Sequence, residues 1–191
     1  MNKWKNYLAA TLLGACVQAY AAPILTASPT PNPVTVGSSV DLNVMISDIA
    51  DLYAYEFTLT FDARLLRATA ITEGGFLGTA GTTFGDTGVI DNAAGTISFV
   101  FNTLLGPVPG AYGSGSLARV RFESLGAGSS PVGFSEWLFL DSVSNDIVVG
   151  AEAAVVQAVV QDVPEPATYL LFGVGLVAVG ALRRRQLSVR A

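Results

Sequence analysis

The stretch that decides the fold is "VTVGSSVDLNVMISDIADLYAYEFTLTFDARLLRATAI", residues 34–71. In residues 40–47 and again in residues 53–61, large apolar side chains stand at every second position. This spacing indicates strands that bury one face, and the second strand has an aromatic inner face. The inward positions are Val40, Leu42, Val44 and Ile46 in the first strand and Tyr53, Tyr55, Phe57, Leu59 and Phe61 in the second.

The rest of the body, residues 22–161, continues with short strands between turns. Residues 91–102, "DNAAGTISFVFN", predict a turn and then a strand with Ile97, Phe99 and Phe101 on one side. A strand is predicted in residues 116–124, residues 131–149 predict one strand followed by a turn at residues 144–146, and a last strand runs through residues 151–161. Its β-branched valines favour strand over helix there. The glycine-rich segments 73–88 and 103–115 are predicted loops, the first with a weak strand in it, and this order of strands and loops predicts a two-sheet sandwich.

Charge is unevenly distributed along the chain. Residues 22–163 contain four arginines, no lysine and fourteen acidic residues, a formal charge of −10 against −5 for the whole chain. Such a body repels phosphates, which excludes nucleic acid as a partner, whereas cations or basic partners remain open. With no histidine and a single cysteine, Cys16, the body has no histidine base, thiol nucleophile or disulfide.

The N-terminus has the three parts of a secretory signal peptide. A basic start is followed by an apolar stretch and by small residues, so residues 1–21 are predicted to be removed after Ala21. A second interpretation stays open, because "LGAC", residues 13–16, resembles a lipobox whose Cys16 would carry the lipid.

The C-terminus, "VPEPATYLLFGVGLVAVGALRRRQLSVRA", predicts a proline hinge, a membrane helix and a basic stop. Residues 167–182 carry no charge, and as a helix they would extend about 24 Å, short for a bilayer core of about 30 Å. Arg183, Arg184 and Arg185 are predicted to remain cytoplasmic, with the body on the other side. A plain single-pass anchor is the simpler alternative.

This order of motif, apolar helix and basic cluster resembles the PEP-CTERM sorting signal of Gram-negative bacteria, here residues 162–191. The matching motif is Pro164, Glu165 and Pro166. The resemblance implies processing by the membrane protease-transpeptidase exosortase and an association with exopolysaccharide or another extracellular matrix. It also implies an inner-membrane-anchored precursor that later reaches the cell surface or the medium.

The body, residues 22–161, resembles a cohesin-type domain. Ala63 and Ser38 depart from the family pattern, which has proline and an acidic residue there. The resemblance implies an all-β, two-sheet jelly-roll sandwich of eight or nine strands that binds a dockerin module on one sheet face. Some carbohydrate-binding modules have a similar architecture. The matching positions are Val36, Gly37, Val40, Leu42 and Val44, then Tyr55, Phe57, Leu59, Phe61, Asp62, Leu65 and Leu66.

Candidate sites in the body are weakly defined by sequence. The acid pairs Asp86 with Asp91 and Glu56 with Glu123 have no pattern that places them in a cleft, so no enzyme activity and no catalytic residue is predicted. Oxygen-rich loops offer candidate calcium ligands, although Asx turns explain the same residues. The calcium candidates are Asp91, Asn92, Asp141, Asn145 and Asp146, and the candidates for a sugar-binding platform are Tyr112, Phe76, Phe84 and Trp137.

The sequence therefore predicts an exported, non-enzymatic protein with a binding or structural role at the surface or in the matrix. A docking module for a dockerin-like partner and a carbohydrate-binding module are the alternatives. No cofactor is required by any of them.

Overall fold

The computed structural model describes residues 21–161. Cys16 and most of the predicted signal peptide, the sorting motif at 164–166, the helix at 167–182 and the arginines at 183–185 all lie outside these residues. Ala21, the predicted cleavage position, is the first described residue and precedes every strand. Within residues 21–161 no helix is long and apolar enough to cross a membrane.

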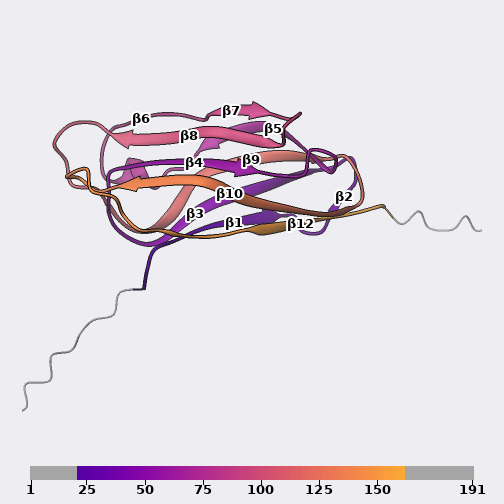
Figure 1. The fold of residues 1–191 in the computed structure, drawn as a ribbon, viewed down its shortest axis with the longest axis horizontal. Helices are drawn as coiled ribbons and strands as arrows, with labels where there is room; N and C mark the ends of the chain where they lie inside the picture. Colours follow the sequence, from indigo (N-terminus) through magenta and orange to yellow (C-terminus); the bar gives the residue numbers. More distant parts are fainter. Residues whose placement is uncertain (1–20, 162–191) are drawn as a thin grey trace, which may run out of the picture. The chain divides into compact units, whose positions relative to one another are not determined.

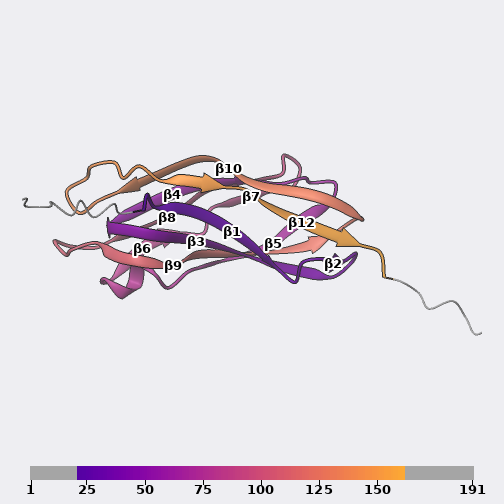
Figure 2. The same cartoon turned by 90° about the horizontal axis from the view of Figure 1, so that it is seen from below.

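Within the described residues, twelve strands form two sheets, and there is one short 3-10 helix, η1 (Leu77–Thr79). Figures 1 and 2 show the two sheets stacked as layers. The first sheet has the order β11 (Gly150–Glu152), β1 (Ile24–Thr30), β3 (Ser39–Leu52), β9 (Ala111–Ser124) and β5 (Leu66–Glu73). The second has the order β2 (Val34–Thr35), β12 (Ala154–Val159), β10 (Gly128–Leu140), β4 (Ala54–Thr60), β8 (Thr96–Leu104) and β6 (Thr83–Asp86), with β7 (Val89–Asp91) also paired to β8.

The core lies between the inner faces of these sheets. Phe57 and Phe139 on the seven-stranded sheet and Phe122 on the five-stranded sheet are fully buried. Phe122 also meets the ring of Phe61 edge-on, with the ring centroids 5.0 Å apart. Packing of this kind between aromatic rings adds to the free energy gained from burying their area.

The predicted alternation in residues 40–47 and 53–61 is largely confirmed. In β3 the residues Val40, Leu42, Val44 and Ile46 are buried, and their neighbours are not. In β4 the buried residues are Tyr55, Phe57 and Leu59. Tyr53 precedes β4 and is only half-buried, and its hydroxyl donates to the Gly106 carbonyl oxygen at 2.7 Å.

The number of strands exceeds the predicted eight or nine. Eight strands have six or more residues, and the other four have only two to four. Strands that short carry no readable alternation, so sequence patterns cannot reveal them.

The single last strand predicted for residues 151–161 is two strands in the structure, because the chain leaves the five-stranded sheet after β11 and joins the other sheet as β12. β9 begins at Ala111, five residues before the predicted Ser116.

The prediction that Ile97, Phe99 and Phe101 share one side of their strand is wrong. Ile97 is fully buried, whereas Phe99 is 62% exposed and Phe101 is half-buried. The cause is a β-bulge, since the register with β4 shifts between Phe57 and Leu59. One extra residue in β8 reverses the side to which the following residues point.

Candidate binding face

The outer side of the seven-stranded sheet gathers exposed apolar side chains from four strands. Because directly paired residues on neighbouring strands point to the same side, the register shows which side chains meet there. Opposite Glu56 of β4 lie Leu138 of β10 and Phe101 of β8. We call this surface the apolar face, and it consists of Ala54, Glu56, Thr58, Phe84, Asp86, Phe99, Phe101, Thr103, Glu136, Leu138 and Leu140.

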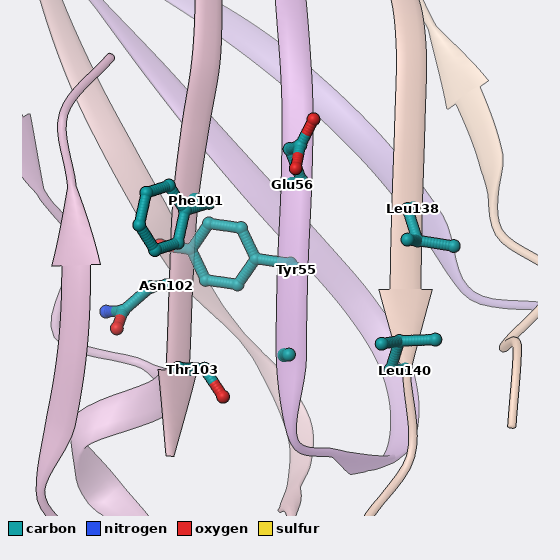
Figure 3. Close-up of a pocket in the computed structure, with 8 residues that line it drawn as sticks. Tyr55, Glu56, Phe101, Asn102, Thr103, Leu138 and Leu140 are labelled. Atoms are coloured by element: carbon teal, nitrogen blue, oxygen red, sulfur yellow. The ribbon is translucent and has the colours of Figure 1, made fainter. Parts of the chain in front are cut away.

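A groove runs along this face over β4. Figure 3 shows Leu138 and Leu140 on one neighbouring strand and Phe101 and Thr103 on the other. The groove has a volume of about 130 Å³, and its walls are mostly apolar. Pockets for drug-sized ligands usually have volumes of about 300–1,000 Å³. The groove is therefore too small to enclose such a ligand and suits contact with side chains of another macromolecule.

Exposed aromatic side chains extend the apolar area beyond the groove. Phe84 on β6 is 61% exposed, and its ring centroid is 6.1 Å from that of Phe101. Leu138 is 45% exposed at the opposite side of the groove. Single exposed apolar residues are common on proteins, but a group of them over adjacent strands marks an interaction surface.

The apolar face carries negative charge only. Glu56 lies at its centre, and Asp86 and Glu136 lie on the flanking strands β6 and β10. None of the strands of this sheet, all within residues 34–159, contains a lysine or an arginine. The face therefore combines apolar contact area with carboxylates that have no cation on the same sheet.

The outer side of the five-stranded sheet has the opposite character. Arg121 of β9 forms an ion pair with Asp41 of β3 at 2.8 Å, and Arg67 of β5 pairs with Glu123. The hydrogen bond from Arg121 lowers the pKa of Asp41. We call this surface the charged face, and its polar groups largely satisfy one another.

Polar side chains beneath the groove connect its floor to the other sheet. Asn102 of β8 is buried and donates to the Glu73 carboxylate of β5, and Thr83 donates to the same carboxylate at 3.3 Å. The Tyr55 hydroxyl donates to the Leu117 carbonyl oxygen at 2.7 Å. Burial, followed by the negative charge of Glu73, raises the pKa of Tyr55. These bonds hold the groove floor in one arrangement.

The calcium candidates divide between two separate turns. Asp91 is the last residue of β7 and Asn92 follows it, at the end of the sheet where Thr60 pairs with Thr96. Asp141 and its neighbours follow β10 at the other end, where Leu140 pairs with Ala54. The five residues Asp91, Asn92, Asp141, Asn145 and Asp146 therefore do not form one group.

Hydrogen bonds to the backbone occupy the side chains of Asp91, Asn92 and Asp141. Asp91 accepts from the backbone N–H groups of Ala93 and Ala94, and Asp141 accepts from those of Val143 and Asn145. Asn92 bonds to both backbone groups of Ala68. Residues 21–161 contain no group of three or more acidic, histidine or cysteine residues placed to hold a metal ion. Calcium binding at either turn stays a prediction.

The four aromatic candidates for sugar binding do not form a platform. Phe76 belongs to the core, and the indole N–H of Trp137 donates to the Val149 carbonyl oxygen at 3.0 Å. Phe84 lies on the apolar face, whereas Tyr112 lies on β9 of the other sheet.

The members of the two acid pairs also lie apart in the fold. Glu56 and Glu123 lie on opposite outer faces of the sandwich, and Asp86 and Asp91 lie on the separate strands β6 and β7.

The sequence did not predict that three residues of the apolar face contribute to a site: Phe99, Leu138 and Leu140. Only the register of four strands brings them together.

Comparison with known families identifies the domain. Residues 26–156 match the model of the cohesin domain. The chain belongs to the cohesin family. Residues 162–185 match the PEP-CTERM protein-sorting motif. Among curated proteins, none matches the chain significantly in sequence.

Several solved cohesins have the same fold. A non-cellulosomal cohesin from Archaeoglobus fulgidus is 16% identical with a TM-score of 0.57, and the match covers 74% of this chain and 94% of that one. The cohesin module of a family 33 glycoside hydrolase from Clostridium perfringens is 14% identical with a TM-score of 0.58, covering 73% and 100%. The sixth cohesin of scaffoldin B from Acetivibrio cellulolyticus, solved with a mutant Cel5 dockerin, is 20% identical with a TM-score of 0.55, covering 73% and 100%. At these identities the similarity concerns the fold.

The cohesin domain and the sorting motif together indicate the general role of the chain. It is an exported protein with a binding role, and the cohesin fold is a non-catalytic docking module.

Proposed function

We propose that this cohesin is a protein-docking module that takes a dockerin-like partner on its apolar face. The observation that carries the proposal is the apolar face itself, where Phe84, Phe99 and Leu138 are exposed side by side with carboxylates. Several of the similar structures are complexes of a cohesin with a dockerin, and this class of partner is transferred here to the chain.

The contrast between the two outer faces supports the choice of face. On the charged face, Arg121 and Arg67 already have carboxylate partners, so a docking protein would have to compete with existing ion pairs. On the apolar face, contact removes exposed rings and aliphatic side chains from water, and that removal is the main favourable term in association.

The sorting motif accounts for how the docking module is exported and then displayed outside the cell. In this proposal, residues 1–21 direct export, and residues 162–191 hold the precursor in the inner membrane with Arg183–Arg185 on the cytoplasmic side. Exosortase then acts near Pro164–Pro166, and the body, residues 22–161, is displayed at the cell surface or in the extracellular matrix. The matched sorting motif at residues 162–185 supports this sequence of events.

Calorimetric titration of the full chain with dockerin modules encoded by the same organism tests the function. The decisive variants are Leu138→Arg on the apolar face and Met45→Arg on the charged face, since both replace an exposed apolar side chain of a β-strand. We expect Leu138→Arg to weaken binding at least about tenfold and Met45→Arg to leave it unchanged.

Two outcomes would contradict the proposal. If no dockerin module binds and the chain is instead retained on a column of the host's exopolysaccharide, the carbohydrate-binding alternative replaces it. If both arginine variants weaken dockerin binding equally, the apolar face is not the docking surface.

A further inference from the structure

Phe99 has a backbone conformation that is unusual for its residue type. Its φ of 60° lies in the left-handed region, where only three other non-glycine residues of the described chain are found: Asp48, Asp51 and Ser144. Those three are short polar residues, and aspartate in particular is enriched in this region, whereas a bulky side chain there is an outlier.

The bulge in β8 produces this conformation and sets the direction of the ring. Between the pairs Phe57–Val100 and Leu59–Ile97, the single residue Thr58 of β4 faces two residues of β8, Ser98 and Phe99. Phe99 is 62% exposed, so its ring lies on the outer side with Phe101 and not in the core.

The turn between β6 and β7 packs directly against the bulge. A Cβ on Gly88 would lie 2.4 Å from the Ser98 carbonyl oxygen, so only glycine allows this close approach. The N–H of Gly88 donates to Asp86 at 2.8 Å, which ties the turn to the face. The turn therefore packs against one side of the bulge, at Ser98.

The fold does not need a phenylalanine at this position. Glycine adopts a φ of 60° without strain and is the usual residue at a left-handed bulge position. The ring of Phe99 contributes little to the core because most of it is exposed. A strained, exposed aromatic residue at a place where glycine would fit points to a role outside folding.

Charge indicates the chemistry of whatever contacts this ring. The carboxylates of Glu56, Asp86 and Glu136 lie on the same face, and the strands of this sheet contain no cation. A contacting surface with lysine or arginine around an apolar centre would complement both features, whereas an acidic surface would be repelled.

Taking the proposed docking function as its basis, we propose that Phe99 is an anchor side chain of the apolar face. The bulge holds its ring outward, where it enters an apolar pocket of a partner protein whose rim carries lysine or arginine. Phe99 thereby determines which partners fit this face.

Photocrosslinking in the host identifies the contact directly. The full chain is expressed with p-benzoylphenylalanine in place of Phe99, of Leu138 or of Tyr112, and the crosslinked peptides are sequenced by mass spectrometry. Tyr112 is the matched control, because it is 66% exposed and lies on the other sheet. We expect positions 99 and 138 to capture the same protein segment, with apolar residues and nearby lysine or arginine, and position 112 not to capture it.

Affinity and stability measurements on variants complete the test. The captured segment, made as a purified protein, should bind Phe99→Gly roughly thirtyfold more weakly than the parent and Tyr112→Gly with unchanged affinity. Its affinity for the parent should fall as the salt concentration rises, because the rim contacts are ionic. The urea midpoint of Phe99→Gly should equal or exceed that of the parent, since glycine relieves the strain.

The outcomes separate this inference from the docking function. Capture at position 138 without capture at position 99, or full affinity in Phe99→Gly, leaves the docking function standing and overturns the role of Phe99. An acidic captured segment, or a lower urea midpoint in Phe99→Gly, also overturns that role. No capture at either position overturns the docking function as well.

Discussion

The hydroxyl of Tyr55 on β4 donates a buried hydrogen bond to the carbonyl oxygen of Leu117 on β9, at 2.7 Å. This bond joins the two sheets directly beneath the groove of the apolar face. The Leu117 carbonyl also accepts from the backbone N–H of Gly74, so β4, the middle of β9 and the end of β5 are connected at one point.

Replacing Tyr55 by phenylalanine should lower the free energy of unfolding by about 1 kcal/mol. The cost is modest because the Leu117 carbonyl keeps its bond from Gly74. Urea unfolding followed by circular dichroism measures the change, with Tyr53→Phe as the control for a hydroxyl that lies nearer the surface. An unchanged urea midpoint in Tyr55→Phe would show that the bond between the sheets contributes nothing.

Alkaline pH should destabilise the domain through the same tyrosine. Burial raises the pKa of Tyr55 in the folded state, so this group stays protonated while the unfolded chain ionises near pH 10. The stability that Tyr55 contributes is therefore present below about pH 10 and is lost as the pH rises further. The decrease in the free energy of unfolding between about pH 9 and about pH 11 should be smaller in Tyr55→Phe than in the parent.

Acid pH should destabilise the domain through its hydrogen-bonded aspartates. Bonds from Arg64 lower the pKa of Asp62 to about 2, and Arg121 lowers that of Asp41. A pKa below the unfolded value of about 3.9 means stability that is present above about pH 4 and lost as the pH falls toward about 2. NMR titration should show the pKa of Asp62 rising toward 3.9 in Arg64→Ala, and no rise would refute the assigned cause.

Asp51 should be the most sensitive of the acidic residues to truncation. Its carboxylate accepts from the Gly110 N–H at 2.7 Å and from the Ser142 hydroxyl at 2.6 Å, which connects two loops to the end of β3. Asp51→Ala removes these bonds and a longer one from the Ser142 N–H at 3.3 Å, and it leaves alanine at a φ of 58°, so we expect the free energy of unfolding to fall by about 2–3 kcal/mol. Asp51→Asn should lose less, because asparagine tolerates this φ. Equal losses in the two variants would contradict this reasoning.

The sorting proposal is tested by the mass of the mature protein. In the host, the parent should be recovered outside the cell with termini near Ala22 and Pro166, whereas Glu165→Gln with Pro166→Ala should keep Arg183–Ala191 and remain in the membrane fraction. A parent that itself keeps residues 183–191 would indicate a plain anchor. A lipid mass on Cys16 would replace the predicted cleavage after Ala21.

The strands that face the core were accessible to sequence reasoning, because burial of one side imposes an alternation that can be read directly. Val40 to Ile46 and Tyr55 to Leu59 illustrate this, since each buried residue is followed by one that is not. The outward side chains of the same strands carry no such signal. Leu138 and Leu140 meet Phe101 and Phe84 only through the register of β10, β4, β8 and β6, which local sequence does not encode.

The wrong prediction for the side to which Phe99 points has a physical cause, and the same cause explains the proposed role of this residue. Simple alternation assumes one residue in β8 for each residue in β4, and the bulge breaks that rule at Ser98 and Phe99. Departures of a local conformation from the preference of its residue type are expected where a sequence is selected for function as well as folding.

The three carboxylates of the apolar face also affect how copies of the protein behave at high density. An exposed group of rings such as Phe84 and Phe99 is an aggregation hazard at high protein concentration. If two copies met face to face, Glu56, Asp86 and Glu136 of one would oppose the same residues of the other with no cation between them. Like charges brought together in this way disfavour self-pairing and keep the surface open to a basic partner.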